Sequence, residues 1–191
     1  MTPTAAAAAL PPLMTAEEFI RLHGDESCVE LVKGRVVRTP IPGAEHGEVC
    51  LTAGALIREF VKAAGLGRVM GNDTFVRVGT NPDAYRGADV CFVSYAKLPK
   101  DHPRPKGPLE IPPDLVVEVR SPTDRTSDVL LKVSEYLGAG VTVVLVLDPA
   151  LECATVYRQT DDFPQRRHNG DELTLSDVLP GFAVPVRRFF E

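Results

Sequence analysis

A short apolar segment in the middle of the chain constrains its fold more than any other feature. The segment Leu115 to Val119 is aliphatic apart from Glu118, with two prolines just before it and Ser121-Pro122 just after it. An apolar run this short between chain-breaking residues predicts a strand in a sheet that is covered on both faces. A carboxylate in such a strand has lost water, so Glu118 needs a metal, a cation or a shared proton as its partner.

The segments that follow predict how this strand is joined to its neighbour. Residues 127–137 have apolar side chains at helical spacing, and residues 141–147 are a strongly β-branched run. A strand, a helix and a second strand in this order predict a right-handed crossover between parallel strands. Residues 29–37 predict a hairpin that bends at Lys33-Gly34, which indicates antiparallel neighbours. We therefore expect an α/β fold with a mixed central sheet flanked by helices.

Other elements are predicted from capping residues, periodicity and chain breakers. Thr15 and Glu18 form a capping box that begins a short helix, and residues 45–64 have a helical apolar stripe. We expect two short strands at 68–70 and 74–78, a polar turn at 79–86, a strand at 88–93 with Asp89 at its entrance, and a long basic loop at 97–113.

Length and composition indicate one folded domain. The chain has 191 residues, and we expect a flexible tail over residues 1–14 and a single domain over residues 15–191. The net charge of -5 and the absence of tryptophan argue against an extended nucleic-acid coat or a stacking platform. The four cysteines form no Cys-x-x-Cys pair, and no segment has transmembrane length, so we expect a soluble, cytoplasmic protein without disulfides or membrane partners.

Three acidic residues fall in strands that are otherwise built for burial: Glu30, Asp89 and Glu118. Several carboxylates in one small sheet indicate a shared divalent cation, because hard cations prefer oxygen ligands. Lys132 flanks the apolar face of the next helix, where its ammonium group could reach the strand ends. Carboxylates, a lysine and a divalent ion are the components of metal-assisted phosphodiester hydrolysis.

Several short motifs, taken in order, resemble one bacterial family. They are Val29-Glu30-Leu31-Val32-Lys33-Gly34, Glu45-His46, Gly87-Ala88-Asp89-Val90, the segment from Pro113 to Pro122, Asp128-x-x-x-Lys132-x-x-x-Tyr136, Gly140-Val141, Leu147-Asp148-Pro149 and Leu179-Pro180-Gly181-Phe182. Their order and spacing, from about residue 15 to the C-terminus, resemble the Uma2 family of restriction endonucleases within the PD-(D/E)XK nuclease-like superfamily.

The resemblance implies a restriction-endonuclease-like core and a set of site residues. Asp89 and Glu118 would be ligands of Mg²⁺ or Mn²⁺, Glu30 an auxiliary acid, and Lys132 the catalytic lysine, moved from the strand to the following helix.

Two positions depart from the pattern of these relatives. Ala88 stands where the family usually has proline, which affects backbone rigidity more than chemistry. Arg120 stands where the wider superfamily has its lysine, and an arginine does not readily release a proton. Lys132 is therefore the stronger candidate for the lysine role, and Arg120, His46 and Tyr136 are candidate pocket or substrate contacts.

Each candidate also has a structural alternative. Asp89 and Glu118 could form buried ion pairs with Arg86 or Arg120. Glu30 could lie on a solvated hairpin edge, and Lys132 could extend into water. His46 could be a hydrogen-bonded residue at the helix start, and Tyr136 could belong to the core.

The sequence thus predicts a metal-dependent endonuclease that acts on nucleic acid, on DNA in preference to RNA, as a homodimer. One alternative is a catalytically inactive module of the same fold that binds nucleic acid or a protein. Another is a metal-dependent hydrolase of a smaller phosphate ester.

Overall fold

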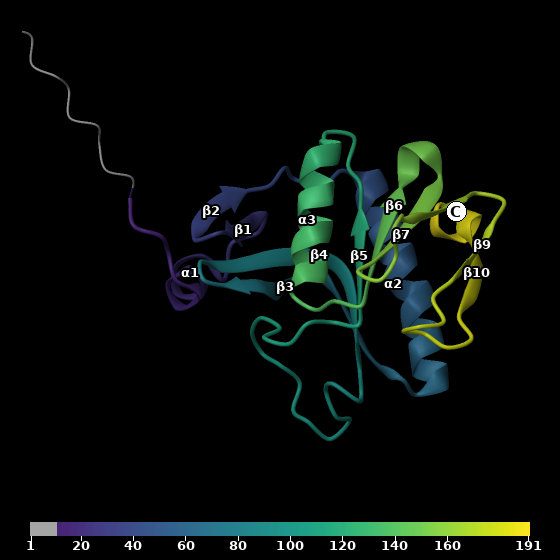
Figure 1. Cartoon of the computed structure of the whole chain (residues 1–191), viewed down its shortest axis with the longest axis horizontal. Helices are drawn as coiled ribbons and strands as arrows, with labels where there is room; N and C mark the ends of the chain where they lie inside the picture. The colour runs from purple at the N-terminus through teal and green to yellow at the C-terminus, as the bar shows by residue number, and fades with distance from the viewer. Residues whose placement is uncertain (1–10) are drawn as a thin grey trace, which may run out of the picture.

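A twisted eight-stranded sheet forms the centre of the protein, which we describe over residues 11–191 from a computed structural model (Figure 1). Seven strands follow the order β2-β1-β4-β5-β6-β7-β8, and β3 pairs with β4 outside this path. The strands are β1 (Val29–Val32), β2 (Arg35–Arg38), β3 (Gly67–Thr80), β4 (Asp83–Ser94), β5 (Leu115–Val119), β6 (Val143–Asp148), β7 (Cys153–Arg158) and β8 (Gln165–His168). The predicted mixed α/β sheet is confirmed.

The crossover predicted around Glu118 is present. Strands β5 and β6 are parallel, and helix α3 (Thr126–Gly138) connects them, whereas the other pairs in the sheet are antiparallel. All five residues of β5 are buried, as expected for a strand covered on both faces.

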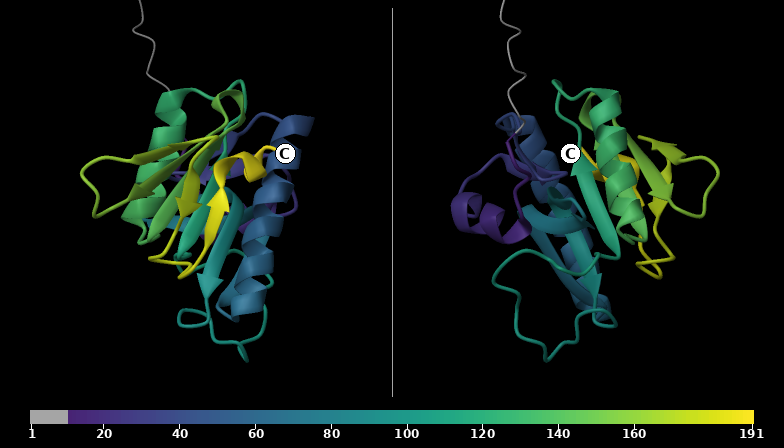
Figure 2. Two further views of the ribbon diagram at one scale, coloured as in Figure 1. Left: turned by 90° about the vertical axis from the view of Figure 1, so that its right-hand side faces the viewer. Right: turned by 60° about the vertical axis from the view of Figure 1, so that its left-hand side comes forward.

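Helices α2 (Ala44–Ala64) and α3 cover opposite faces of the sheet (Figures 1 and 2). Val117 and Val119 pack in one core cluster with residues of α2, and Val116 packs in another with Val133 and Tyr136 of α3. Because side chains alternate along a strand, Glu118 faces the same side as Val116, toward α3.

Smaller elements complete the fold. Helix α1 (Ala16–His23) begins at the predicted capping box and packs beside β1, where Phe19 and Leu31 are fully buried. Strands β9 (Glu172–Thr174) and β10 (Ala183–Pro185) form a separate two-stranded sheet, and short 3-10 helices occupy Pro149–Leu151 and Val186–Phe189.

Strand β4 is long enough to pair with three other strands of the sheet. On one edge β4 pairs with β3, while on the other edge it pairs with β1 at Tyr85 and with β5 from Val90 to Phe92. Within the described residues, no strand pairs with residues 86–89 of β4 on this second edge. The sheet therefore has an opening between β1 and β5, and Asp89 lies in it.

The prediction of two short strands, a long turn and a strand beginning near Asp89 was wrong. Strand β3 is continuous and the turn is confined to the residues between Thr80 and Asp83, so Asp89 lies well inside β4. The polar residues Asn72 and Asp73 have φ angles of 64° and 53° and form a β-bulge rather than a chain reversal. The bulge is fixed by the pairs on both sides of it: Gly71 pairs with Val90 and Thr74 with Ala88, so Asn72 and Asp73 stand opposite the single residue Asp89.

The segment before α1 is described only from residue 11 onward. Most of the predicted tail, residues 1–10, lies outside the described residues, and Met14 donates a backbone hydrogen bond to Gly34.

The long loop between β4 and β5 is present, and Arg68 anchors it through hydrogen bonds to three of its carbonyl groups. Strand β8, which is polar and mostly exposed, was not predicted. No helix among residues 11–191 combines the length and apolar character required to cross a bilayer.

Candidate functional site

Glu118 is buried in the sheet, and each of its carboxylate oxygens accepts a hydrogen bond. The residue is 7% exposed. Its Oε1 accepts a hydrogen bond of 2.9 Å from Tyr136 Oη, and its Oε2 accepts one of 3.1 Å from Lys132 Nζ. Both donors come from helix α3, one turn apart. Of the partners expected for Glu118, a metal, a cation or a shared proton, the structure provides a cation, Lys132.

Asp89 lies beside Glu118 where the pairing between β4 and β5 ends. The last pair is Val90 with Val117, and Asp89 and Glu118 are the next residues on their strands, where the two backbones no longer pair. Beyond that pair, Val119 N donates a 2.7 Å hydrogen bond to Asp89 Oδ2, and His46 Nε2 lies 3.4 Å from the same oxygen. The carboxylate of Asp89 thus lies at the opening of the sheet, between β5 and the first turn of α2.

Lys132 joins two of the predicted acidic residues. Its Nζ lies 3.0 Å from Glu30 Oε1 and 3.1 Å from Glu118 Oε2. Burial alone would lower the pKa of Lys132, but Glu118 and Glu30 together raise it, so the ammonium form is strongly favoured. The side chain points into the site and does not simply extend into water.

Glu30 belongs to a buried ionic network rather than to a solvated hairpin edge. It is 3% exposed, and its Oε1 accepts a 3.2 Å hydrogen bond from Gly87 N. Its Oε2 accepts a 2.6 Å hydrogen bond from Arg86, whose Nε donates to Glu135 at 2.6 Å. The network fixes Glu30, and Glu30 in turn positions Lys132.

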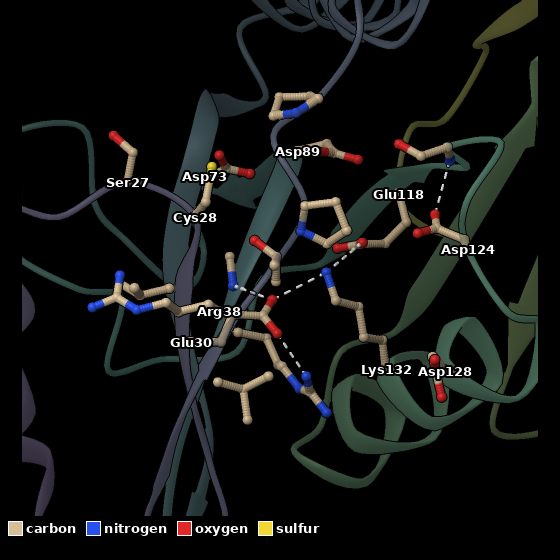
Figure 3. A pocket seen from close by; sticks show the side chains of 18 of the residues that line it. Ser27, Cys28, Glu30, Arg38, Asp73, Asp89, Glu118, Asp124, Asp128 and Lys132 are labelled. Atoms are coloured by element: carbon tan, nitrogen blue, oxygen red, sulfur yellow. Dashed lines mark hydrogen bonds and ion pairs between the residues drawn. The ribbon is translucent and has the colours of Figure 1, made fainter.

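One cavity of about 730 Å³ brings these side chains together (Figure 3). It is lined by Glu30, Asp89, Glu118 and Lys132, and also by His46 and Arg120. Figure 3 shows the ammonium group of Lys132 between the carboxylates of Glu30 and Glu118. The four residues predicted to carry the chemistry therefore share one pocket.

The predicted pocket contacts have different environments. His46 lies beside Asp89, whereas Arg120 donates a 2.8 Å hydrogen bond to Asp148 on β6, away from the paired acids. Tyr136 is fully buried and is not among the residues that line the cavity. Its hydroxyl donates to Glu118 Oε1 and so holds that carboxylate in place.

Comparison with known proteins identifies the family and the fold of this chain. A family model described as "Uma2: Putative restriction endonuclease" matches residues 16–187. This chain belongs to the Uma2 family. Its fold is similar to that of a crystal structure titled "a putative nuclease belonging to DUF820 from Anabaena variabilis", with a TM-score of 0.80 and 18% identity over 93% of this chain and 97% of the other. None of the curated proteins matches it.

Burial sets the acidity of the central carboxyl group in this Uma2 protein. The pKa of Glu118 is raised to about 7, mainly because burial removes water from the carboxylate; Lys132 lowers it, and the negative charges of Asp89 and Glu30 raise it. The pKa of His46 is raised by its hydrogen bond to Asp89, although burial acts against this. Raised pKa values of this kind are common at functional sites.

The sequence reasoning missed two residues of the Uma2 site. Asp73 lines the cavity from the β-bulge opposite Asp89, and burial followed by repulsion from Asp89 raises its pKa. Its only sequence signal was Gly71-Asn72-Asp73, which resembles a turn. The second is Cys50, whose Sγ lies 3.4 Å from His46 Nδ1; from the sequence it was considered only as one of four cysteines without a Cys-x-x-Cys pair. Its i, i+4 spacing from His46 on a predicted helix was an available signal.

The donor groups of the pocket fit a hard divalent cation. Asp89 and Glu118 present carboxylate oxygens from neighbouring strands, and oxygen ligands are those that Mg²⁺ and Mn²⁺ prefer. Asp73 adds a third carboxylate to the same wall. A cation here would replace part of the hydrogen bonding that Lys132 and Tyr136 now supply to Glu118.

Proposed function

We propose that this Uma2 protein is a magnesium- or manganese-dependent nuclease that hydrolyses phosphodiester bonds in DNA. The observation that carries the proposal is the contact between Lys132 and Glu118 in a pocket where Asp89 lies beside Glu118. Two carboxylates and a lysine at an opening in a sheet are suited to phosphodiester hydrolysis. The family description, which names a restriction endonuclease, supports a nucleic-acid substrate.

Each residue would have a distinct part in the reaction. Asp89 and Glu118 would hold the divalent ion, which supplies Lewis acidity and lowers the pKa of bound water. Lys132 keeps its proton in this environment, so it would stabilise the negative charge of the phosphate and orient the attacking water rather than act as a base. Glu30, held by Arg86 and Gly87 N, would keep the ammonium group in place.

The mouth of the cavity offers cations for a nucleic-acid backbone. Arg38 and Arg125 line the cavity, and both are exposed residues. Their charges offset part of the acidic net charge where a phosphate would enter. We further propose a homodimer, because cleavage of both strands of a duplex requires two such sites.

A non-catalytic binding module is the second candidate function. Its support is that the Glu30 and Glu118 carboxylates are already paired within the chain, with Lys132, Arg86 and Tyr136 as donors. A network satisfied in this way can be purely structural. A module of this kind would bind DNA through the rim of the cavity without cleaving it.

The test is cleavage of supercoiled plasmid DNA in the presence of Mg²⁺ or Mn²⁺, with and without chelator. We expect metal-dependent nicking that is lost in Asp89→Asn and in Glu118→Gln. Asp128→Asn is the matched control, because Asp128 is an exposed residue of the same cavity wall and carries the same charge.

Two outcomes would overturn the nuclease proposal. One is cleavage by Asp89→Asn or Glu118→Gln at the rate of the unmutated protein. The other is salt-sensitive DNA binding without cleavage, unaffected by chelator, which would establish the binding module.

A further inference from the structure

Beside the pocket, His46, Cys50 and Asp89 bring together nitrogen, sulfur and oxygen donors, whereas magnesium prefers oxygen ligands alone. His46 and Cys50 lie one turn apart on α2 and therefore point to the same side of the helix. They meet Asp89, which comes from β4. Within the described residues, this is the one group of three or more His, Cys, Asp or Glu side chains whose ligand atoms all lie within 4.8 Å of one another.

The two distances from His46 Nε2 to the other ligand atoms are close to those of a tetrahedral zinc site, and all three atoms lie within 4.8 Å of one another. Zinc bonds of about 2.0–2.2 Å to nitrogen and oxygen and about 2.3 Å to sulfur give ligand-to-ligand separations of roughly 3.3–3.6 Å. His46 Nε2 lies 3.4 Å from Asp89 Oδ2 and 3.9 Å from Cys50 Sγ. Small side-chain rotations would therefore be enough to close the site around an ion.

The geometry points to a binding site for a zinc-class divalent ion formed by His46 Nε2, Cys50 Sγ and Asp89 Oδ2. A thiolate and an imidazole favour zinc and its neighbours over magnesium, which prefers oxygen ligands. The thiol of Cys50 would release its proton to solvent when its sulfur bonds the ion, and no redox change is involved. The fourth position would face the cavity, because His46 and Asp89 both line it.

Occupation of this site has a consequence for the proposed nuclease, and this step rests on the proposed function. Asp89 belongs both to the oxygen pair with Glu118 and to the His46–Cys50 group. An ion held by His46 and Cys50 would draw Asp89 away from the magnesium ligands. Zinc would therefore inhibit magnesium-dependent cleavage.

The other cysteines in the described part of the chain do not belong to a group of possible metal ligands. Cys91 and Cys153 are buried among strands, and Cys28 lies at a different part of the cavity wall. Neither they nor their neighbours form a second group of ligand atoms in residues 11–191. Cys28→Ser is therefore a matched control for Cys50→Ser, because it removes a partly exposed thiol from the same region.

The binding test uses cobalt as a spectroscopic substitute for zinc. Titration of the full chain with Co²⁺ is expected to give a thiolate-to-cobalt absorption band in the near ultraviolet at one ion per chain, which Zn²⁺ abolishes. The band should be lost in Cys50→Ser and retained in Cys28→Ser. Zn²⁺ affinity, measured by competition with a coloured chelator, should fall at least about ten-fold in Cys50→Ser and in His46→Gln.

The inhibition test separates this site from the nuclease proposal. If the protein cleaves DNA, Cys50→Ser should need at least about ten-fold more Zn²⁺ for half-inhibition of its own magnesium-dependent activity. If it cleaves nothing, the nuclease proposal fails and the cobalt band still decides the metal site. Absence of the band, or an unchanged band in a folded Cys50→Ser protein, would overturn the site.

Discussion

Lys132 Nζ lies 3.1 Å from Glu118 Oε2, and the two residues stand 14 positions apart on helix α3 and strand β5. Because α3 is the crossover between two parallel strands, it lies directly over the face of β5 that presents Glu118. The lysine therefore reaches the carboxylate from the helix, and Arg120, two residues after Glu118, pairs with Asp148 instead.

Replacement of Lys132 tests this relationship. Lys132→Met keeps much of the length of the side chain but removes its charge, and we expect DNA cleavage to fall by about 100-fold or more. Lys132→Arg retains the charge and should recover part of the activity. Cleavage rates at saturating magnesium, with circular dichroism to confirm folding, provide the measurement. A rate within a few-fold of the unmutated protein would remove Lys132 from the mechanism.

The acidity of Glu118 predicts a pH-dependent affinity for magnesium. Burial raises the pKa of Glu118 to about 7, so in the metal-free protein the carboxyl group is mostly protonated at pH 6 and mostly ionised at pH 8. Protons and metal compete for the same oxygens, and the apparent affinity should therefore fall about ten-fold from pH 8 to pH 6. Calorimetry at the two pH values measures this change.

A second titrating group requires a control in that experiment. The pKa of His46 is also raised, and its imidazolium form would repel a cation as the pH falls. His46→Gln removes this contribution and should leave the part due to Glu118. A flat affinity between pH 8 and pH 6 in His46→Gln would contradict the raised pKa of Glu118.

The buried network around Arg86 predicts a large stability effect. Arg86→Met leaves the carboxylates of Glu30 and Glu135 without their guanidinium partner, and we expect a loss of about 3–5 kcal/mol in the free energy of unfolding. Arg38→Met is the control, because the Arg38 side chain is 69% exposed and pairs with Glu26 at the surface, where the loss should stay below about 1 kcal/mol. Urea unfolding measures both, and equal losses would show that the network contributes no special stability.

The basic loop between β4 and β5 should not take part in cleavage. It joins the start of β5, whereas Glu118 lies near the end of that strand, and none of its residues lines the cavity (Figure 1). The start of β5 lies three residues before Glu118, about 10 Å along the strand. That is about one Debye length at 0.1 M salt, so exposed charges further out in the loop are largely screened from the site. Replacement of Lys100, Arg104 and Lys106 by serine should leave the cleavage rate of a short duplex within about two-fold.

Arg125 provides the comparison for this loop. It lines the cavity, so Arg125→Ser should weaken binding of the same duplex and reduce the salt dependence of binding. A larger effect from the loop than from Arg125 would place the substrate on the far end of the sheet.

Much of the site could be predicted because it depends on local patterns. Glu118 stands out as a charge within an apolar run, and a carboxylate in a buried strand requires a partner. The placement of Lys132 follows from the helical spacing of residues 127–137, since it flanks the apolar stripe that packs on the sheet. The position of Asp89 beside Glu118 could not be predicted in the same way, because it depends on which residues of β4 pair with β5.

The residues that were missed depend on long-range pairing. Asp73 enters the cavity because two residues of β3 stand opposite Asp89 alone, and no local rule distinguishes this bulge from a turn. Cys50 gains its significance from Asp89, 39 positions later in the chain, which approaches α2 only in the folded protein.

By itself, the sequence determined the buried strand around Glu118, the crossover helix that carries Lys132 and the mixed α/β class of the fold. These features follow from hydrophobic periodicity and chain breakers, which act over a few residues. Only the tertiary structure decided that β4 pairs with both β1 and β5 on one edge, with an opening between them where Glu30, Asp89 and Glu118 converge. The reason is that strand register and ion-pair choice depend on contacts between distant segments, such as Arg86 with Glu30 and Arg120 with Asp148, whose energies exist only once the chain has folded.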